Sequence, residues 1–134
     1  DLHVFHADYD GFIDLRPTGD EEDELPVFQY VQTDAEFTGL EAEVEFRATE
    51  ALTLGLGYDV VRGETDLGNP ARIPPSSLTA KASYAFGDFT LRGQVRRVAE
   101  QDRVAEFELP TDGYTTADAF ISWAPGGRGL TLYA

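Results

Sequence analysis

The sequence contains neither cysteine nor methionine among its 134 residues. The lack of cysteine excludes disulfide frameworks, thiolate metal sites and cysteine nucleophiles together. Because methionine is missing and the sequence starts at Asp1 within a strand-like run, we expect it to be an excerpt from a longer protein. The lack of a signal peptide in this sequence therefore excludes no cellular location.

Basic residues are scarce, with 10 Lys and Arg against 25 Asp and Glu, and the formal net charge is −15. A protein that binds nucleic acid needs a basic surface that displaces counterions from the phosphates. The composition therefore predicts no nucleic-acid partner, and cations suit this negative field better. The alternative that the acidic residues only keep the protein soluble stays open.

Long apolar runs are also missing. No stretch approaches the about 20 consecutive apolar residues of a membrane-spanning helix. Apolar and polar residues alternate instead: from Leu40 to Arg47, apolar side chains occupy the even positions and charged side chains the odd positions. A strand sends successive side chains to opposite faces, whereas a helix would mix the two sets.

Similar alternation predicts strands along the whole sequence, around residues 5–15, 40–47, 52–60, 77–86, 89–96 and 115–123. The links between these strands alternate in length. Short links lie at 49–50, 87–88 and 125–129, and long polar links at 16–32, 62–76 and 99–113. Short turns at one rim and long loops at the other are typical of outer-membrane β-barrels. We predict an all-β fold, an antiparallel up-and-down meander of about seven strands that forms part of one transmembrane barrel domain over residues 1–134.

The two faces of these strands suit different surroundings. A fully charged face needs water, which a wide barrel lumen supplies, and we expect five residues there: Glu41, Glu43, Glu45, Arg92 and Arg96. The apolar set would face outer-membrane lipid: Leu40, Val44, Leu54 and Leu56. Aromatic residues near strand ends suit the interfacial girdles of such a barrel: Tyr58, Tyr84, Phe86, Phe89 and Trp123. Alternation alone leaves open which face points inward.

One cluster near the start of the sequence carries metal-ligand residue types: His3, His6, Asp8 and Asp10. On a regular strand, His6, Asp8, Asp10 and Asp14 share a face, and His3 points the other way. Imidazole and carboxylate suit zinc and related divalent ions, but same-face neighbours about 7 Å apart need help from an adjacent strand or loop. We name His6, Asp8 and Asp10 as candidate metal ligands. The alternative is a solvated lumen face.

An acidic run lies in the first long link: Asp20, Glu21, Glu22, Asp23 and Glu24. Like charges this dense repel one another and usually remain solvated. The spacing lacks the alternating ligands and turn glycine of an EF-hand calcium loop. We predict an acidic extracellular loop, which either attracts cations at the barrel mouth or is a plain solvated loop.

Motifs for catalysis are missing. The sequence has no serine in a nucleophile-elbow context, no phosphate-binding glycine loop and no His-Glu-x-x-His. Carboxylates are so frequent in this acidic sequence that pairs of them single out no catalytic site. We predict that the protein is not an enzyme, and an outer-membrane lipase or protease barrel lacks support.

Several stretches resemble the TonB-dependent outer-membrane receptors, and most closely the branch associated with zinc uptake. The stretches are Phe28–Tyr30, Asp34–Glu43, Gly57–Gly63, Ala71–Pro75, Ala99–Glu108 and Thr111–Tyr114. The most specific are the Arg-Ile-Pro-Pro element that ends at Pro75 and the Thr-Asp-Gly-Tyr element that ends at Tyr114. The resemblance covers essentially the whole chain, as a late part of the barrel.

The resemblance implies a barrel of about 22 strands around an N-terminal plug. It also implies energy from the TonB complex, received through an N-terminal region that, like the plug and the closing strand, lies outside this sequence. We predict an outer-membrane receptor that takes up a scarce metal ion or metal chelate, with zinc favoured as substrate and no cofactor. The alternative is a small soluble antiparallel β-barrel that binds a ligand.

Overall fold

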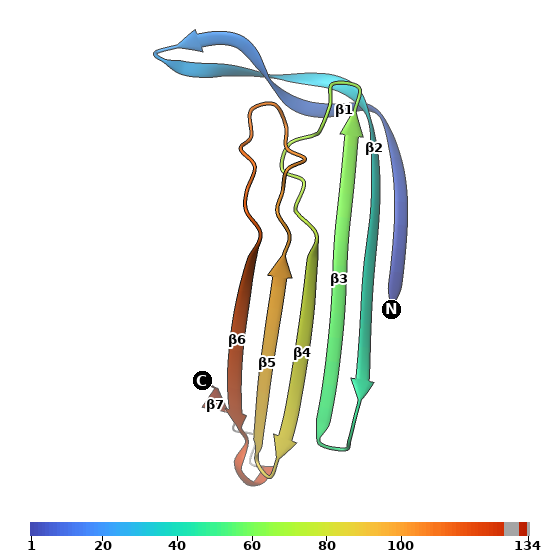
Figure 1. Ribbon diagram of the computed structural model, residues 1–134, viewed down its shortest axis with the longest axis vertical. Coiled ribbons are helices and arrows are strands. Elements are labelled where there is room, and N and C mark those ends of the chain that lie inside the picture. The colour runs from blue at the N-terminus through green and yellow to red at the C-terminus, as the bar shows by residue number, and fades with distance from the viewer. Residues whose placement is uncertain (128–131, 134) are drawn as a thin grey trace.

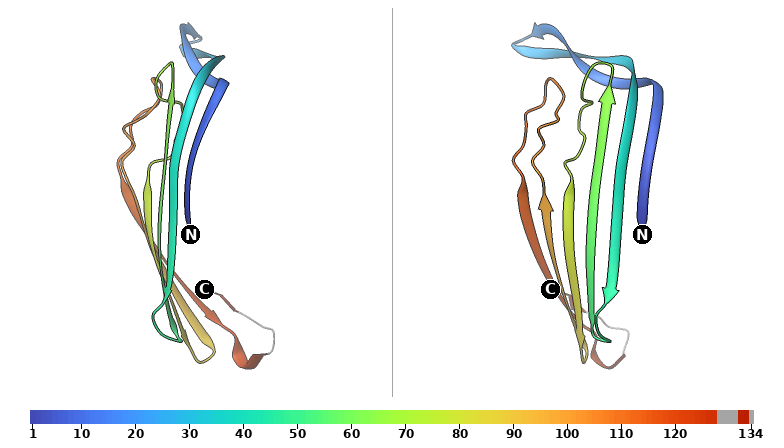
Figure 2. Two further views of the ribbon diagram at one scale, coloured as in Figure 1. Left: turned by 90° about the vertical axis from the view of Figure 1, so that its right-hand side faces the viewer. Right: turned by 45° about the vertical axis from the view of Figure 1, so that its right-hand side comes forward.

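One antiparallel sheet contains all the strands of the protein, which we describe from a computed structural model at residues 1–127 and 132–133. The strands follow one another in chain order across the sheet (Figure 1). They are β1 (Leu2–Glu22), β2 (Leu25–Arg47), β3 (Leu52–Thr65), β4 (Ser77–Phe86), β5 (Phe89–Val98), β6 (Tyr114–Trp123) and β7 (Leu132–Tyr133), with a short 3₁₀ turn, η1 (Pro125–Gly127), before β7. The predicted all-β meander is confirmed. The described sheet is twisted and open rather than closed into a barrel (Figure 2).

Two of the three predicted long links and two of the short ones lie at opposite ends of the sheet, as the sequence predicts. Residues 66–76 and 99–113 form irregular connections at one end of the sheet, which we call the long-loop end (Figure 1). Residues 48–51 and 87–88 form tight connections at the opposite, short-turn end. β3 runs on to Thr65, past the predicted start of its long link at Arg62. Of the predicted short link at 125–129, residues 128 and 129 lie outside the described residues.

The first predicted long link, residues 16–32, is wrong. β1 and β2 stay paired up to Glu22 and Leu25, so only Asp23 and Glu24 form the turn. Both turn residues have positive φ, 53° and 65°, as in the two-residue turns that match the twist of a hairpin. The charged sequence resembles a loop because both faces of this hairpin tip are solvated, and a strand without a buried face needs no alternation. The predicted acidic loop is therefore the end of β1 and its turn.

The strand register aligns side chains into rows with separate faces. On the apolar face, one row contains Val44, Leu56, Ala80 and Val95, from β2 to β5. On the polar face, one row contains Glu45, Gly55, Lys81, Gln94 and Asp118. The apolar face is uncovered: the exposed fractions of Leu54 and Leu56 are 42% and 52%. So large an exposed apolar surface needs lipid or a partner to cover it.

Aromatic side chains line the apolar face at the short-turn end. The rings of Tyr84 and Phe86 stack at 5.8 Å, those of Phe86 and Phe89 at 5.5 Å, and those of Phe89 and Trp123 at 6.1 Å. These residues come from three neighbouring strands, β4, β5 and β6. Four of the five residues predicted for an interfacial girdle form this row, whereas Tyr58 lies opposite Leu78, nearer the long-loop end. Aromatic side chains favour the boundary between lipid and water, and the position of the row at that boundary stays a prediction.

Buried residues gather at the long-loop end. The buried apolar side chains are Ala35, Val98 and Ala105, the buried polar ones are Asp14, Arg16, Thr33 and Ser77, and Pro70 is fully buried. The rest of the described sheet is a single layer without an enclosed core. Among the described residues, no helix is long and apolar enough to span a membrane.

A bulge in β1 exchanges its two faces. Asp8 lies opposite Glu36 before the register shift between Tyr9 and Phe12, and Asp14 lies opposite Val31 after it. Glu36 and Val31 are an odd number of residues apart on β2, so Asp8 and Asp14 point to opposite faces. Gly11 within the bulge has a φ of 74°, which glycine adopts without strain. The prediction that Asp14 shares a face with His6 and Asp8 is therefore wrong.

Candidate functional site

The polar face brings together the residues predicted to face a lumen. One row across four neighbouring strands runs from Glu43 on β2 through Gly57 on β3 and Thr79 on β4 to Arg96 on β5. By the same register, one face carries the whole predicted set: Glu41, Glu43, Glu45, Arg92 and Arg96. Because the described sheet is open, their position in a lumen stays a prediction.

Glycines in β3 open the polar face to contacts between strands that are not neighbours. Lys81 on β4 forms an ion pair with Glu43 on β2, with 3.0 Å between Nζ and Oε1, although β3 lies between them. The positions crossed are Gly55 and Gly57, where no side chain intervenes. A Cβ atom at Gly55 would lie 3.5 Å from the Lys81 Cβ atom, so a larger side chain would crowd the lysine. Alternate glycines on a polar strand face were the sequence signal for this contact.

Hydrogen bonds extend the polar network toward the long-loop end. Ser77 donates to the Asp59 carboxylate at 2.6 Å, and Arg96 Nε donates to the Ser77 hydroxyl at 3.1 Å. Nearer the short-turn end, a depression of about 550 Å³ is lined by side chains of both charges and by one aromatic ring. Its lining residues include Glu43, Lys81, Arg92, Gln94 and Phe120. The face therefore offers paired charges and hydrogen-bonding groups, as a water-filled binding surface does.

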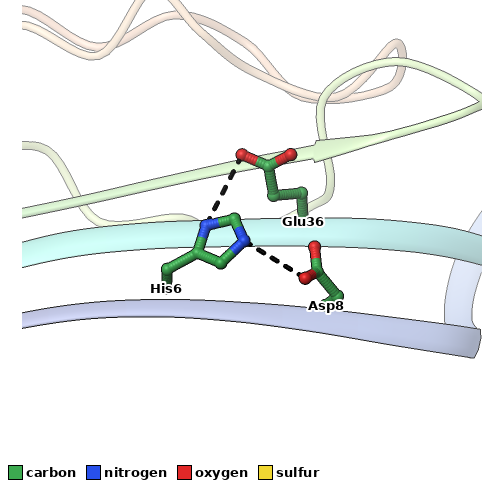
Figure 3. A group of neighbouring side chains, drawn as sticks. All are labelled: His6, Asp8 and Glu36. Carbon is green, nitrogen blue, oxygen red and sulfur yellow. Dashed lines mark hydrogen bonds and ion pairs between the residues drawn. The ribbon is translucent and has the colours of Figure 1, made fainter.

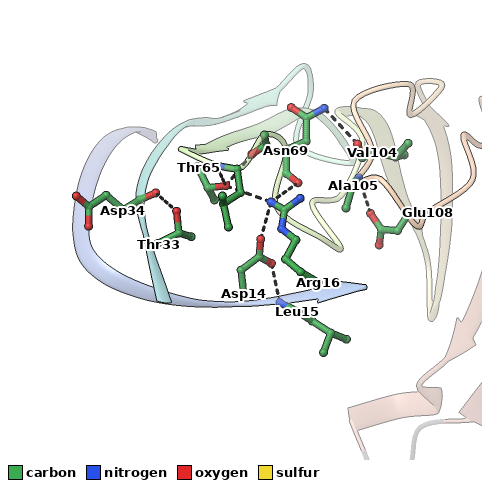
Figure 4. Close-up of polar contacts among 12 residues, drawn as sticks. Asp14, Leu15, Arg16, Thr33, Asp34, Thr65, Asn69, Val104, Ala105 and Glu108 are labelled. Carbon is green, nitrogen blue, oxygen red and sulfur yellow. Dashed lines mark hydrogen bonds and ion pairs between the residues drawn. The ribbon is translucent and has the colours of Figure 1, made fainter. Parts of the chain in front are cut away.

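The Arg16 side chain, which is paired with Asp14 of the same strand, ties the hairpin to the loops at the long-loop end (Figure 4). Arg16 Nη2 lies 2.7 Å from Asp14 Oδ2, and the side chains are only 10% and 5% exposed. The same guanidinium donates to the Thr65 hydroxyl at 3.2 Å and to the Asn69 carbonyl at 3.4 Å. The Asn69 amide in turn donates to the Val104 carbonyl at 3.2 Å. One chain of contacts thus joins β1, β3 and both irregular loops.

Further contacts hold the same assembly together. Arg103 pairs with Glu64 at 2.8 Å, and the Arg72 amide donates to the Glu108 carboxylate at 2.9 Å. The Phe28 ring meets the Phe107 ring edge-on at 5.0 Å, so the hairpin rests on loop 99–113. This arrangement is a structured cap, in which the loops support one another. Charge composition gave no sign of it, because the partners come from distant parts of the sequence.

His6, Asp8 and Glu36 form the metal-ligand group of the described residues (Figure 3). His6 Nε2 lies 3.1 Å from Asp8 Oδ2, and His6 Nδ1 lies 3.8 Å from Glu36 Oε1. Asp10, the third residue predicted from the sequence, is outside this group. Glu36 was missed because it belongs to β2, and only the register places it opposite Asp8. Metal binding by these residues stays a prediction.

This group lies on the apolar face, away from Glu41, Glu43 and Glu45. Asp8 is opposite Glu36 on β2, and Leu40 and Val44 share the face of Glu36 because they are an even number of residues away. The apolar residues of the same part of β1 have the opposite placement: Phe5, Ala7 and Tyr9 lie opposite Gly39, Phe37 and Ala35, on the polar face. Local alternation in β1 gave the two sets correctly, but only pairing with β2 shows which side each set takes.

The acidic run projects at the tip of the β1–β2 hairpin. Asp20, Glu21 and Glu22 end β1, and Asp23 and Glu24 form its turn. All five are exposed. The structure therefore presents these carboxylates to solvent together, and cation attraction by them remains a prediction.

The model of the family described as TonB dependent receptor-like, beta-barrel matches residues 1–134. The chain belongs to this TonB-dependent receptor family. As a barrel segment of the family, it is similar in structure to the copper transporter OprC, with a TM-score of 0.83 and 19% sequence identity over 98% of this chain and 22% of that one. It is also similar to the FrpB iron transporter from Neisseria meningitidis (F3-3 variant), with a TM-score of 0.66 and 16% identity over 94% of this chain and 21% of that one. No curated protein sequence matches the chain.

These likenesses concern the fold, because both identities are low and the TonB-dependent receptor segment spans about a fifth of each transporter. The family predicted from the sequence motifs is confirmed. The zinc-uptake branch, which rested on the same motifs, stays a prediction.

Proposed function

We propose that the chain is part of an outer-membrane receptor that takes up a scarce metal ion or metal chelate with energy from the TonB complex. The observation that carries the proposal is a family-matched, single-layer sheet with one exposed apolar face and one charged face. The transporters similar in structure are named for copper and iron, which supports a metal substrate. TonB would be contacted through a region outside this sequence.

The apolar face is the one that we assign to lipid. β4, β5 and β6 each contain 10 residues, which matches the about 9–11 residues that a tilted strand needs to cross the bilayer. The stacked aromatic row then marks one interface, at the short-turn end. Outer-membrane barrels have short turns on the periplasmic side, so the cap of hairpin and loops faces the outside.

The polar face would then line the lumen, where water solvates its charges. This assignment explains why ionisable side chains such as Glu43, Lys81 and Arg96 occur on a membrane-spanning sheet, since an ion in contact with lipid is strongly disfavoured. Near the cap, the rings of Tyr9, Phe12 and Phe37 gather on this same face, with centroids 5.3–6.2 Å apart. Aromatic and charged groups together suit contact with a metal chelate at the mouth.

Zinc is the metal ion that we favour. The segment has no cysteine or methionine, so it lacks the sulfur ligands that select copper(I). Its donors are carboxylates and imidazoles, which suit zinc and similar divalent ions. The motifs quoted above resemble the zinc-uptake branch of the family. A soluble ligand-binding barrel has less support, because Leu54 and Leu56 are exposed where that fold needs a core.

The test is accumulation of radioactive zinc by cells that express the intact receptor, with and without a functional TonB complex. We expect accumulation that requires both. A ferric chelate taken up in place of zinc would keep the uptake receptor and discard the zinc assignment. Absence of TonB-dependent accumulation of any metal or chelate would overturn the proposal.

A further inference from the structure

We propose that His6, Asp8 and Glu36 bind a divalent transition-metal cation on the outer side of the barrel, at the head-group level of the outer leaflet. The proposal rests on the membrane orientation given above, but it does not require the receptor to transport zinc. It concerns a site outside the lumen, whereas uptake passes through the lumen.

The donor atoms are already gathered. One ligand atom from each of the three residues lies within 4.8 Å of the others, and His6 Nε2 and Asp8 Oδ2 are 3.1 Å apart. Two ligand atoms bonded to one tetrahedral zinc at about 2.1 Å lie about 3.4 Å from each other. A metal ion bonds one ring nitrogen, whereas Asp8 faces Nε2 and Glu36 faces Nδ1, so side-chain rotation must bring both carboxylates to the same nitrogen. The side chains are 55–72% exposed and are free to rotate. Three protein ligands leave a further position for an oxygen ligand from the surroundings.

The acidic residues around this group need a counterion. Asp8 lies directly opposite Glu36, and Glu36 lies directly opposite Glu64, so three carboxylates form one row across β1, β2 and β3. Like charges directly opposite on neighbouring strands destabilise a sheet. Among the described residues, Glu64 pairs with Arg103 at 2.8 Å, whereas the ion-pair partner of both Asp8 and Glu36 is the imidazole of His6. A divalent cation bound there removes the repulsion and uses the imidazole as a ligand.

The position of the group on the apolar face fixes its depth. Val4 lies opposite Leu40, and both are on the face that we assign to lipid. His6 is the next residue of β1 on that face, about 7 Å farther along the strand from Val4. Thr38, Arg62 and Glu64 follow on the same face, so the apolar surface ends at this level. A cation held here lies among the lipid head groups, on the side of the cap.

The first test is calorimetric titration of Zn²⁺ into the purified intact receptor after removal of metal with a chelator. Changing a residue around a metal ligand costs 10- to 100-fold in affinity, so we expect loss of a ligand in Glu36→Gln to weaken one binding event at least about tenfold. The matched control is Asp10→Asn, which removes a neighbouring carboxylate outside the group and should leave the isotherm unchanged. Identical isotherms for the wild type and Glu36→Gln would overturn the site.

The second test locates the cation. The receptor is placed in nanodiscs that contain a lipid with a fluorescent head group, and Ni²⁺ is added as a bound quencher. We expect saturable quenching, reversed by chelator, in the wild type and in Asp10→Asn but not in Glu36→Gln. Binding without such quenching would refute the head-group position. Neither test measures uptake. A receptor that transports no zinc would refute the proposed zinc function, and the titration and the quenching would still decide whether this site binds a cation.

Discussion

Replacing Leu54 by arginine tests the assignment of the two faces. Leu54 lies opposite Phe46 and Ala82 on the apolar face. It is two residues along β3 from Leu52, which lies opposite Tyr84 of the aromatic row, and eight residues from Arg62 at the charged edge. An arginine on the lipid face costs about 2–4 kcal/mol at the bilayer centre and about 0–1 kcal/mol near the interfaces, so we expect about 1–3 kcal/mol at this depth. Since every 1.4 kcal/mol is a factor of ten, the folding equilibrium should fall by about 5- to 140-fold.

The neighbouring residue gives the matched control. Thr53 lies opposite Arg47 and Ser83 on the polar face, so Thr53→Arg adds a charge that water can solvate and a like-charge neighbour that costs below about 1 kcal/mol. The assay is urea-dependent folding of the intact receptor into lipid vesicles, followed by the gel shift between folded and unfolded barrel. Equal losses in the two variants would refute the assignment of lipid and lumen faces.

Two further predictions concern the cap. Arg16→Met leaves the Asp14 carboxylate buried without its partner, which costs about 3–5 kcal/mol of local stability. Because Arg16 also bonds the Asn69 carbonyl, hydrogen exchange of the backbone amides of residues 66–76 should become faster. Unchanged exchange would show that the ion pair holds nothing in place. In Gly63→Ala, the new Cβ atom would lie 2.7 Å from the Phe37 ring and 2.8 Å from Pro70, so the ring and loop must shift at a cost of about 1–3 kcal/mol. Limited proteolysis of loop 66–76 in the intact receptor should then be faster, and wild-type cleavage rates would contradict the packing.

Sequence pattern predicted the strands of the membrane part because their faces meet different surroundings. Val44 and Glu45 lie on opposite faces of the sheet, one apolar and one charged, so hydrophobicity alternates with every second residue along the strand. The tip of the hairpin, residues 19–26, is exposed on both faces, and the base of the hairpin buries the charged Arg16. The composition between Arg16 and Gln32 therefore does not separate an apolar face from a polar one. The strands of the hairpin are held by main-chain pairing, which any residue type provides, and the pattern therefore resembled a loop.

The candidate metal group shows a second limit. Residue type singled out His6 and Asp8, but the residue that the structure places beside them is Glu36 of β2, and Asp10 lies outside this group. Glu36 is 28 residues from Asp8, and only the register of β1 against β2 brings them together. The sequence pattern did not predict the bulge at Gly11 either, because one extra residue in a polar run leaves the composition of that run unchanged.

The mutual support of hairpin and loops restricts how the outer surface of this receptor can vary. Arg16 reaches a carbonyl 53 residues away, Arg103 reaches a carboxylate 39 residues away, and Asn69 bonds a carbonyl 35 residues away. An insertion that suits one connection therefore disturbs the anchoring of the other two. Under pressure from antibodies or phages, which select for changes at exposed surfaces, these segments should diversify as a coordinated set. A loop transplanted alone from a related receptor would lack its anchoring partners, whereas the three segments exchanged together would bring them along.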